Sequence, residues 1–153
     1  MKHYIRKGRR FVQIEDQTGK FYNDDGTFSV ERQENSIGVC FKQTQEKRFI
    51  VELQVTKEIS WNDAQANVTS NRYLPDMEQA VLICNTLHKL KSRFLICKDF
   101  YYVHWWTSSE YNSHVAWHWN WGNSASFAFF RPDSKDYASQ YCGAQYVFEL
   151  PLV

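Results

Sequence analysis

Residues Trp105–Gly122 read WWTSSEYNSHVAWHWNWG and hold five of the chain's six tryptophans. From position 117 onward, tryptophan alternates with His118 and Asn120. Because successive side chains of a strand point to opposite faces, this alternation predicts a strand with indoles on one face and polar groups on the other. We therefore expect Trp106 and Trp117 in the core, and the side chains of His118 and Asn120 in solvent.

The length of the chain, 153 residues, predicts a single domain spanning residues 1–153. Its 18 basic and 17 acidic residues give a net charge of +1, so no attraction to nucleic acid is expected from the whole chain. One basic cluster stands at the N-terminus, within residues 1–10. We expect this segment to be a solvated, flexible tail.

No signal peptide and no apolar run of about 18 residues, long enough to span a membrane, can be recognised. The expectation is a soluble chain made in the cytoplasm, then either assembled into a phage particle or exported by a dedicated route. Its cysteines, Cys40, Cys84, Cys97 and Cys142, form no Cys-x-x-Cys pair, which argues against a zinc site or a redox dithiol. We expect buried free thiols, while an oxidising environment would allow three pairings. No metal or cofactor is expected.

Short strands separated by turns are predicted for most of the chain. The predicted strands are Phe11–Ile14, Lys20–Val30 (interrupted by a turn at Asn23–Gly26), Ile37–Phe41, Arg48–Val55, Phe94–Ile96, Tyr101–Trp106, Ala116–Trp121, Ser126–Phe130 and Tyr146–Leu150. Arg131–Ser134 contains a proline and is predicted to interrupt the strands there. The pattern indicates antiparallel sheets.

Two helices are predicted between these strands. The first covers Trp61–Ser70, because Ser60 and Asp63 have the spacing of a capping box. The second covers Asp76–Leu90, where Asp76 has the residue type of an N-cap and Gln79 stands three positions later. Its apolar residues form one broad face, which predicts packing against a sheet.

The order of several motifs resembles that of the C-type-lectin-like domains of bacterial and phage proteins. The matching residues are Tyr22, Asp25–Thr27, Ile37–Val39, Trp61 with Ala64, Leu74–Pro75, Trp106–Tyr111 and Ala116–Trp117. Together they cover most of the chain, from about residue 21 to residue 150. The resemblance implies an α+β, C-type-lectin-like fold, in which two helices pack on antiparallel sheets and long loops follow in the C-terminal part.

One branch of that family, the variable proteins of diversity-generating retroelements and similar phage receptor-binding tips, binds ligands through its C-terminal stretch. Adenine mutagenesis turns an AAC asparagine codon into a restricted set of residue types, and the region after Glu110 is rich in those types. The resemblance implies ligand contacts by Asn112, Ser113, His114, His118, Asn120, Asn123, Ser124, Ser126, Phe127, Tyr137 and Tyr141, with the tryptophans, Lys135 and Gln140 as unvaried scaffold. The chain departs from this branch at Tyr146–Leu150, where the relatives often have an Arg-rich strand.

Three classes of function remain open. The first is a non-catalytic module that binds a protein or glycan receptor, in which exposed rings and amides supply the contacts. The second is an oxidoreductase similar to formylglycine-generating enzymes, which hold copper with a cysteine pair. The third is a structural module that oligomerises in a phage or cell-surface particle. Because no nucleophile motif or phosphate loop is present, no catalytic residue is assigned and the binding module is favoured.

Overall fold

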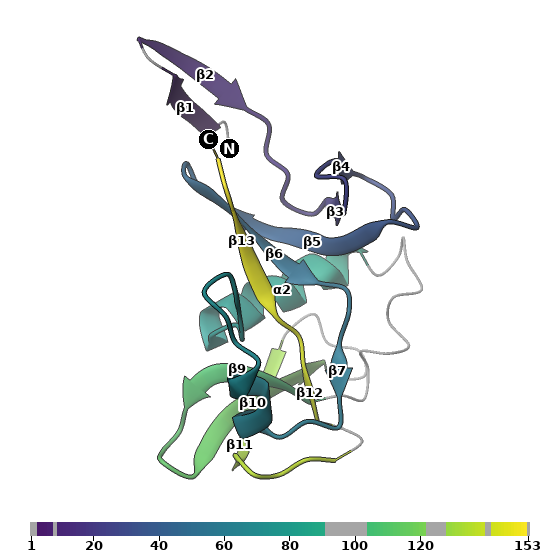
Figure 1. Ribbon diagram of the computed structural model, residues 1–153, viewed down its shortest axis with the longest axis vertical. Coiled ribbons are helices and arrows are strands. Elements are labelled where there is room, and N and C mark those ends of the chain that lie inside the picture. The colour runs from purple at the N-terminus through teal and green to yellow at the C-terminus, as the bar shows by residue number, and fades with distance from the viewer. Residues whose placement is uncertain (1–2, 8, 91–103, 122–127, 140–141, 153) are drawn as a thin grey trace.

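The computed structural model describes residues 3–7, 9–90, 104–121, 128–139 and 142–152 (Figure 1). Within these ranges the chain forms two helices and thirteen strands in three sheets, a mixed α+β structure. None of the described helices is long and apolar enough to cross a membrane.

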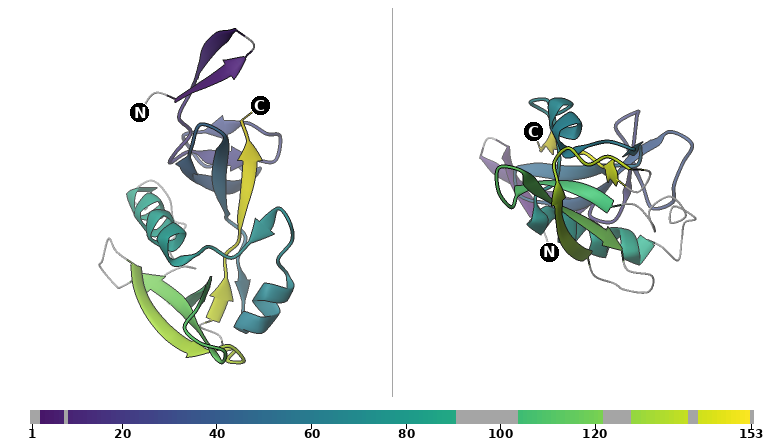
Figure 2. Two further views of the ribbon diagram at one scale, coloured as in Figure 1. Left: turned by 90° about the vertical axis from the view of Figure 1, so that its left-hand side faces the viewer. Right: turned by 90° about the horizontal axis from the view of Figure 1, so that it is seen from below.

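A two-stranded hairpin begins the chain at one end of the molecule (Figures 1 and 2). Strand β1, His3–Lys7, pairs antiparallel with β2, Arg10–Ile14, and the partner positions run from His3↔Ile14 to Lys7↔Arg10. The segment predicted as a basic tail therefore includes a strand. The described side chains between positions 4 and 13 are exposed, among them Tyr4 and Arg9.

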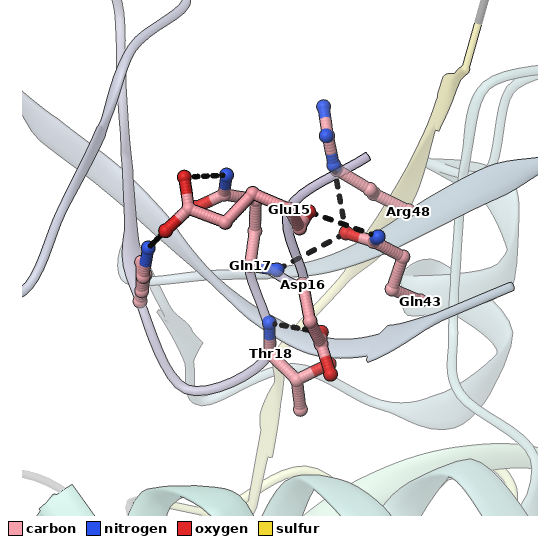
Figure 3. Close-up of polar contacts among 7 residues, drawn as sticks. Glu15, Asp16, Gln17, Thr18, Gln43 and Arg48 are labelled. Carbon is pink, nitrogen blue, oxygen red and sulfur yellow. Dashed lines mark hydrogen bonds and ion pairs between the residues drawn. The ribbon is translucent and has the colours of Figure 1, made fainter. Parts of the chain in front are cut away.

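A polar network joins the end of this hairpin to the neighbouring sheet (Figure 3). The Gln43 side chain accepts from the backbone N–H of Gln17 at 3.1 Å and donates to the carbonyl oxygen of Glu15, also at 3.1 Å. Arg48 donates to the same Gln43 oxygen at 2.9 Å. Gln17 and Gln43 are buried, and burying polar groups without hydrogen-bond partners would destabilise the fold. These bonds supply partners for the groups that form them and fix the path of the chain.

The largest sheet has six strands and is antiparallel throughout. Its order is β4 (Phe28–Ser29), β3 (Phe21–Asn23), β5 (Ser36–Gln43), β6 (Lys47–Glu52), β13 (Val147–Pro151) and β8 (Arg72–Tyr73). The predicted turn between β3 and β4 is confirmed, since Gly26 has a φ of +86° and donates to the carbonyl of Asn23. Glycine adopts that left-handed backbone conformation without steric cost.

Helix α2, Met77–Leu90, packs on one face of this sheet, as predicted. Its start is a reciprocal cap: the N–H of Gln79 donates to Asp76 at 2.7 Å, and the N–H of Asp76 donates to the Gln79 side chain at 3.1 Å. The apolar face of α2 meets Val39, Val51 and Val147 from the central strands, forming a cluster that we call the α2 core.

Helix α1, Trp61–Ala66, starts as predicted but ends earlier than Ser70. The Ser60 side chain caps it by accepting from the N–H of Asp63 at 3.1 Å. At the other end, the Asn67 side chain donates to the carbonyl of Asp63, and Thr69 then forms a β-bridge with Arg72. The predicted end is wrong because asparagine caps the helix and the chain turns back into β8.

The second large sheet has five strands. Its order is β11 (Ala128–Ser134), β10 (Val115–Trp121), β9 (His104–Glu110), β12 (Cys142–Ala144) and β7 (Thr56–Lys57). The prediction of purely antiparallel sheets is wrong at one pair, because β12 runs parallel to β9. The predicted interruption at Arg131–Ser134 is also wrong: Pro132 lies within β11, an edge strand, where a missing N–H can face solvent.

Strands β9 and β10 send large rings into clusters on opposite faces. Trp105 and Trp119 belong to the α2 core, while Trp106 joins Trp61 and Tyr146 in a second cluster, the α1 core. The indole N–H of Trp106 donates to the carbonyl of Ile59 at 2.9 Å, and that of Trp61 to the carbonyl of Thr107 at 2.7 Å. This sheet is therefore packed on both faces, and the prediction that Trp106 lies in the core is confirmed.

The predicted facing of β10 is wrong at His118, which was expected in solvent and is only 2% exposed. Asn120, also expected in solvent, is half-buried, as is Trp117. The prediction assumed one dry and one wet face, as antiparallel sheets often have. Here the α1 core covers the face that carries Ala116 and His118. An irregularity in the pairing of β10 with β9 also falls between these two positions, where the Thr107 hydroxyl donates to the carbonyl of Trp117.

Candidate functional site

Backbone hydrogen bonds within the turn between β9 and β10 stabilise it. The N–H groups of Tyr111 and Asn112 both donate to the carbonyl of Val115, at 2.9 and 3.1 Å. The Asn112 side chain accepts from the N–H of His114 at 2.8 Å, which closes an asparagine turn. Asn112, Ser113 and His114, three of the predicted ligand contacts, are exposed.

Lys135 holds this turn in place through several hydrogen bonds. Its buried ammonium group donates to the Glu110 carboxylate at 2.6 Å and to the carbonyl of Ser113 at 3.1 Å, and it lies 4.6 Å from the centre of the Trp61 ring. Its backbone N–H donates to the carbonyl of His114 at 3.0 Å. Lys135 thus ties the turn to the end of β11 and to α1.

Two exposed tyrosines lie beside the turn. Tyr111 is 59% exposed and meets the Trp117 ring edge-on, with 5.3 Å between ring centres. Tyr137 is 46% exposed and follows the end of β11, where its N–H donates to the carbonyl of Ser134. Ser134 pairs with Val115, so both tyrosines belong to the same end of the sheet. We call the exposed residues Tyr111, Asn112, Ser113, His114 and Tyr137 the turn surface.

His118, predicted as a ligand contact, lies inside the protein. Its ring stacks on His104 at 4.5 Å and meets Trp106 edge-on at 5.5 Å. Burial, reinforced by the neighbouring His104, lowers the pKa of His118 from 6.5 to about 4. The ring is therefore neutral at physiological pH, and it contributes to packing rather than to the turn surface.

The remaining predicted contacts divide into two groups. Asn120 is half-buried on β10 and lies outside the turn surface. Asn123, Ser124, Ser126, Phe127 and Tyr141 lie outside the described residues. Tyr111 was missed by the sequence reasoning, although an aromatic residue directly before the polar run Asn-Ser-His, between two predicted strands, was a usable signal.

The described cysteines are buried and free: Cys40, Cys84 and Cys142. Burial raises the pKa of Cys40 to about 12 and that of Cys84 to about 11, so neither thiol is activated as a nucleophile. Cys84 belongs to the α2 core and Cys142 to the α1 core, so the structure does not bring these two together. Cys97 lies outside the described residues.

The described part of the chain contains no group of three or more histidine, cysteine, aspartate or glutamate side chains that could hold a metal ion. The comparisons with known proteins assign no family: no family model matches the chain, and no curated protein matches it as a relative.

Proposed function

We propose that this chain is a non-catalytic binding module that holds a protein or glycan receptor on the turn surface. The observation that carries the proposal is the combination of two exposed tyrosines with a backbone pinned by Lys135. Tyrosine offers a large contact area at a low cost in conformational entropy. A turn that is already ordered loses little further freedom when a ligand binds.

The surroundings of each tyrosine support this role. Tyr111 rests on the edge of Trp117, which limits the orientations of its ring while leaving more than half of it exposed. Asn112, Ser113 and His114 add hydrogen-bonding groups beside it. An aromatic anchor surrounded by adaptable polar groups is the usual composition of a binding surface.

We further propose that the fold is C-type-lectin-like. The support is the order of the elements: β5 carries Ile37–Val39, α1 begins at Trp61 with Ala64 one turn later, and α2 follows Leu74–Pro75. Strand β9 then contains the Trp106–Glu110 motif, and the last strand, β13, pairs with β6. Similarity to the variable proteins of retroelements remains part of this proposal.

The proposal is tested by screening the purified chain against an array of glycans and an array of cell-surface protein ectodomains. The informative variant is Tyr111→Ala/Tyr137→Ala, because both side chains are exposed and neither forms part of a core cluster. Asn112→Ala and His118→Ala are unsuitable, since the first opens the turn and the second leaves a cavity. Tyr4→Ala is the matched control, because Tyr4 is 44% exposed but lies on β1, in a different sheet.

We expect to find receptors on the arrays that the wild type and Tyr4→Ala bind and that the double variant does not bind. Hits that survive in the double variant would place the binding site elsewhere. The oligomeric state of each protein is measured by sedimentation. If the wild type is an oligomer and the double variant is a monomer, the turn surface is an assembly interface and the structural alternative is correct.

A further inference from the structure

A concave site lies on the six-stranded sheet, where β5 begins and β6 ends. The cavity measures about 560 Å³, within the range of about 300–1,000 Å³ that small-molecule sites occupy. Its main lining residues are Arg32, Ile37, Leu53, Gln54, Arg72 and Phe148. None of them belongs to the turn surface, so this site is separate from the proposed receptor site.

An ion pair between Arg72 and Glu52, whose opposite charges cancel, forms one wall of the cavity. Arg72 donates from Nε and Nη2 to the two carboxylate oxygens of Glu52, at 2.7 and 3.0 Å. Its guanidinium carbon also lies 3.6 Å from the centre of the Tyr146 ring, and Tyr146 itself is buried. The guanidinium plane is therefore held between a carboxylate and a ring, and a planar ligand can stack against such a plane.

The cavity also has apolar walls. Phe148 is half-buried, and its ring is backed by Tyr22 at 5.8 Å between ring centres. Leu53, directly after β6, is half-buried, and Ile37 in β5 is exposed; the backbone N–H of Leu53 donates to the carbonyl of Ile37 at 2.9 Å. Because burying apolar surface is the main favourable contribution in most ligand sites, these side chains favour a ligand with a hydrophobic body.

Arg32 supplies a positive charge to the lining. It is exposed, and no described residue forms a hydrogen bond or an ion pair with it. Arg72, by contrast, is already neutralised by Glu52. An acidic group on a ligand would therefore gain a charged partner at Arg32 without having to break an existing pair.

We propose that this cavity binds a small aromatic anion, whose ring packs on Phe148 and the Arg72 plane and whose acidic group pairs with Arg32. Such a ligand uses the apolar walls, the fixed plane and the unpaired charge together. A neutral ring leaves Arg32 unused, and a small inorganic anion leaves the apolar walls exposed to water. The amide of Gln54 is available for one further hydrogen bond.

The experiment uses 8-anilinonaphthalene-1-sulfonate, a fused aromatic ring that carries a sulfonate, and N-phenyl-1-naphthylamine, the same skeleton without the charge. Each probe is titrated by fluorescence into the wild type, Arg32→Glu and Phe148→Ala, and the bound region is mapped by shifts of backbone amides in NMR spectra. Arg9→Glu is the matched control, because Arg9 is also exposed and undergoes the same charge reversal on the hairpin.

We expect Arg32→Glu to weaken binding of the sulfonate at least tenfold while leaving the neutral probe within twofold of its wild-type affinity. Phe148→Ala should weaken both probes at least fivefold, and Arg9→Glu should weaken neither. Unchanged melting temperatures of Arg32→Glu and Arg9→Glu show that these charge reversals leave the fold intact. Equal affinity of the sulfonate for the wild type and Arg32→Glu, or amide shifts confined to residues outside the cavity, overturns the proposal.

Discussion

The two large sheets of this molecule bury their faces differently. The five-stranded sheet packs tryptophans on both faces, Trp105 and Trp119 into the α2 core and Trp106 into the α1 core. The six-stranded sheet packs one face on α2 and leaves half-buried side chains such as Phe148 and Arg72 on the other. The tryptophan-rich strands therefore act mainly as a scaffold, while the residues of the two proposed binding sites lie at the turn between β9 and β10 and on the six-stranded sheet.

The largest effect is expected from Trp106→Ala, which tests the doubly packed sheet. Removal of a fully buried ring costs about 3–5 kcal/mol, and here it also leaves the carbonyl of Ile59 without its indole donor. Trp117→Ala should cost about half as much, because Trp117 is only half-buried. Equilibrium denaturation with urea measures both, and a larger loss for Trp117→Ala would mean that β10 faces the other way.

The next effect is a loss of stability in acid, caused by His118. Its pKa is about 4 in the folded protein and about 6.5 when exposed, so protons bind preferentially to the unfolded chain between these values. The stabilisation is complete above about pH 6.5 and is lost as the pH falls towards 4, by about 3 kcal/mol in total. Half-buried His104, whose pKa burial also lowers, contributes in the same direction.

This acid effect is measured by comparing the wild type with His118→Phe, which keeps a ring in the same place. The free energy of unfolding of the wild type should fall more steeply than that of the variant between pH 6.5 and 4. Parallel curves for the two proteins would show that His118 is accessible to solvent.

On the six-stranded sheet, the sharpest test of packing is Gly38→Ala. A methyl group there would meet the Ile50 side chain in a steric clash and would approach the carbonyl oxygen of Val51 to 2.9 Å. Overpacking of this kind costs about 1–3 kcal/mol, and thermal denaturation would show it as a lower melting temperature. An unchanged melting temperature would indicate that this face is looser than described.

A smaller effect on stability is expected from Lys135→Met, which keeps the aliphatic packing on Trp61 but removes the ammonium group. The loss should be about 1 kcal/mol, because Glu110 is exposed and regains water as a partner. Hydrogen exchange of the turn amides, Asn112 to His114, should accelerate while exchange in β5 stays unchanged. Unchanged exchange in the turn would show that the lysine does not pin it.

Much of the fold could be predicted from local sequence. The capping residues Ser60 and Asp76 gave both helix starts, and the glycine-containing turn at Gly26 gave the first hairpin of the six-stranded sheet. Features that depend on distant partners were missed: the parallel pairing of β12 with β9 joins positions nearly 40 residues apart. Similarly, the burial of His118 depends on His104 and Trp106, which no local periodicity reveals.

The candidate sites were predictable to different degrees. The exposed turn from Asn112 to His114 follows from its polar composition between two strands, so the sequence was sufficient there. The cavity on the six-stranded sheet was not anticipated, because its lining comes from positions as distant as Arg32 and Phe148. No short motif joins such residues, and only the pairing of the strands brings them together.

The most direct test of the proposed function is the affinity of the chain for a receptor identified on the arrays. Titration calorimetry would compare the wild type with Tyr111→Ala/Tyr137→Ala and with Tyr4→Ala, all at the same pH and salt concentration. Receptor binding by the turn surface predicts a loss of at least tenfold in the double variant, at an unchanged melting temperature, and no loss in Tyr4→Ala. Equal affinities of the wild type and the double variant would contradict it.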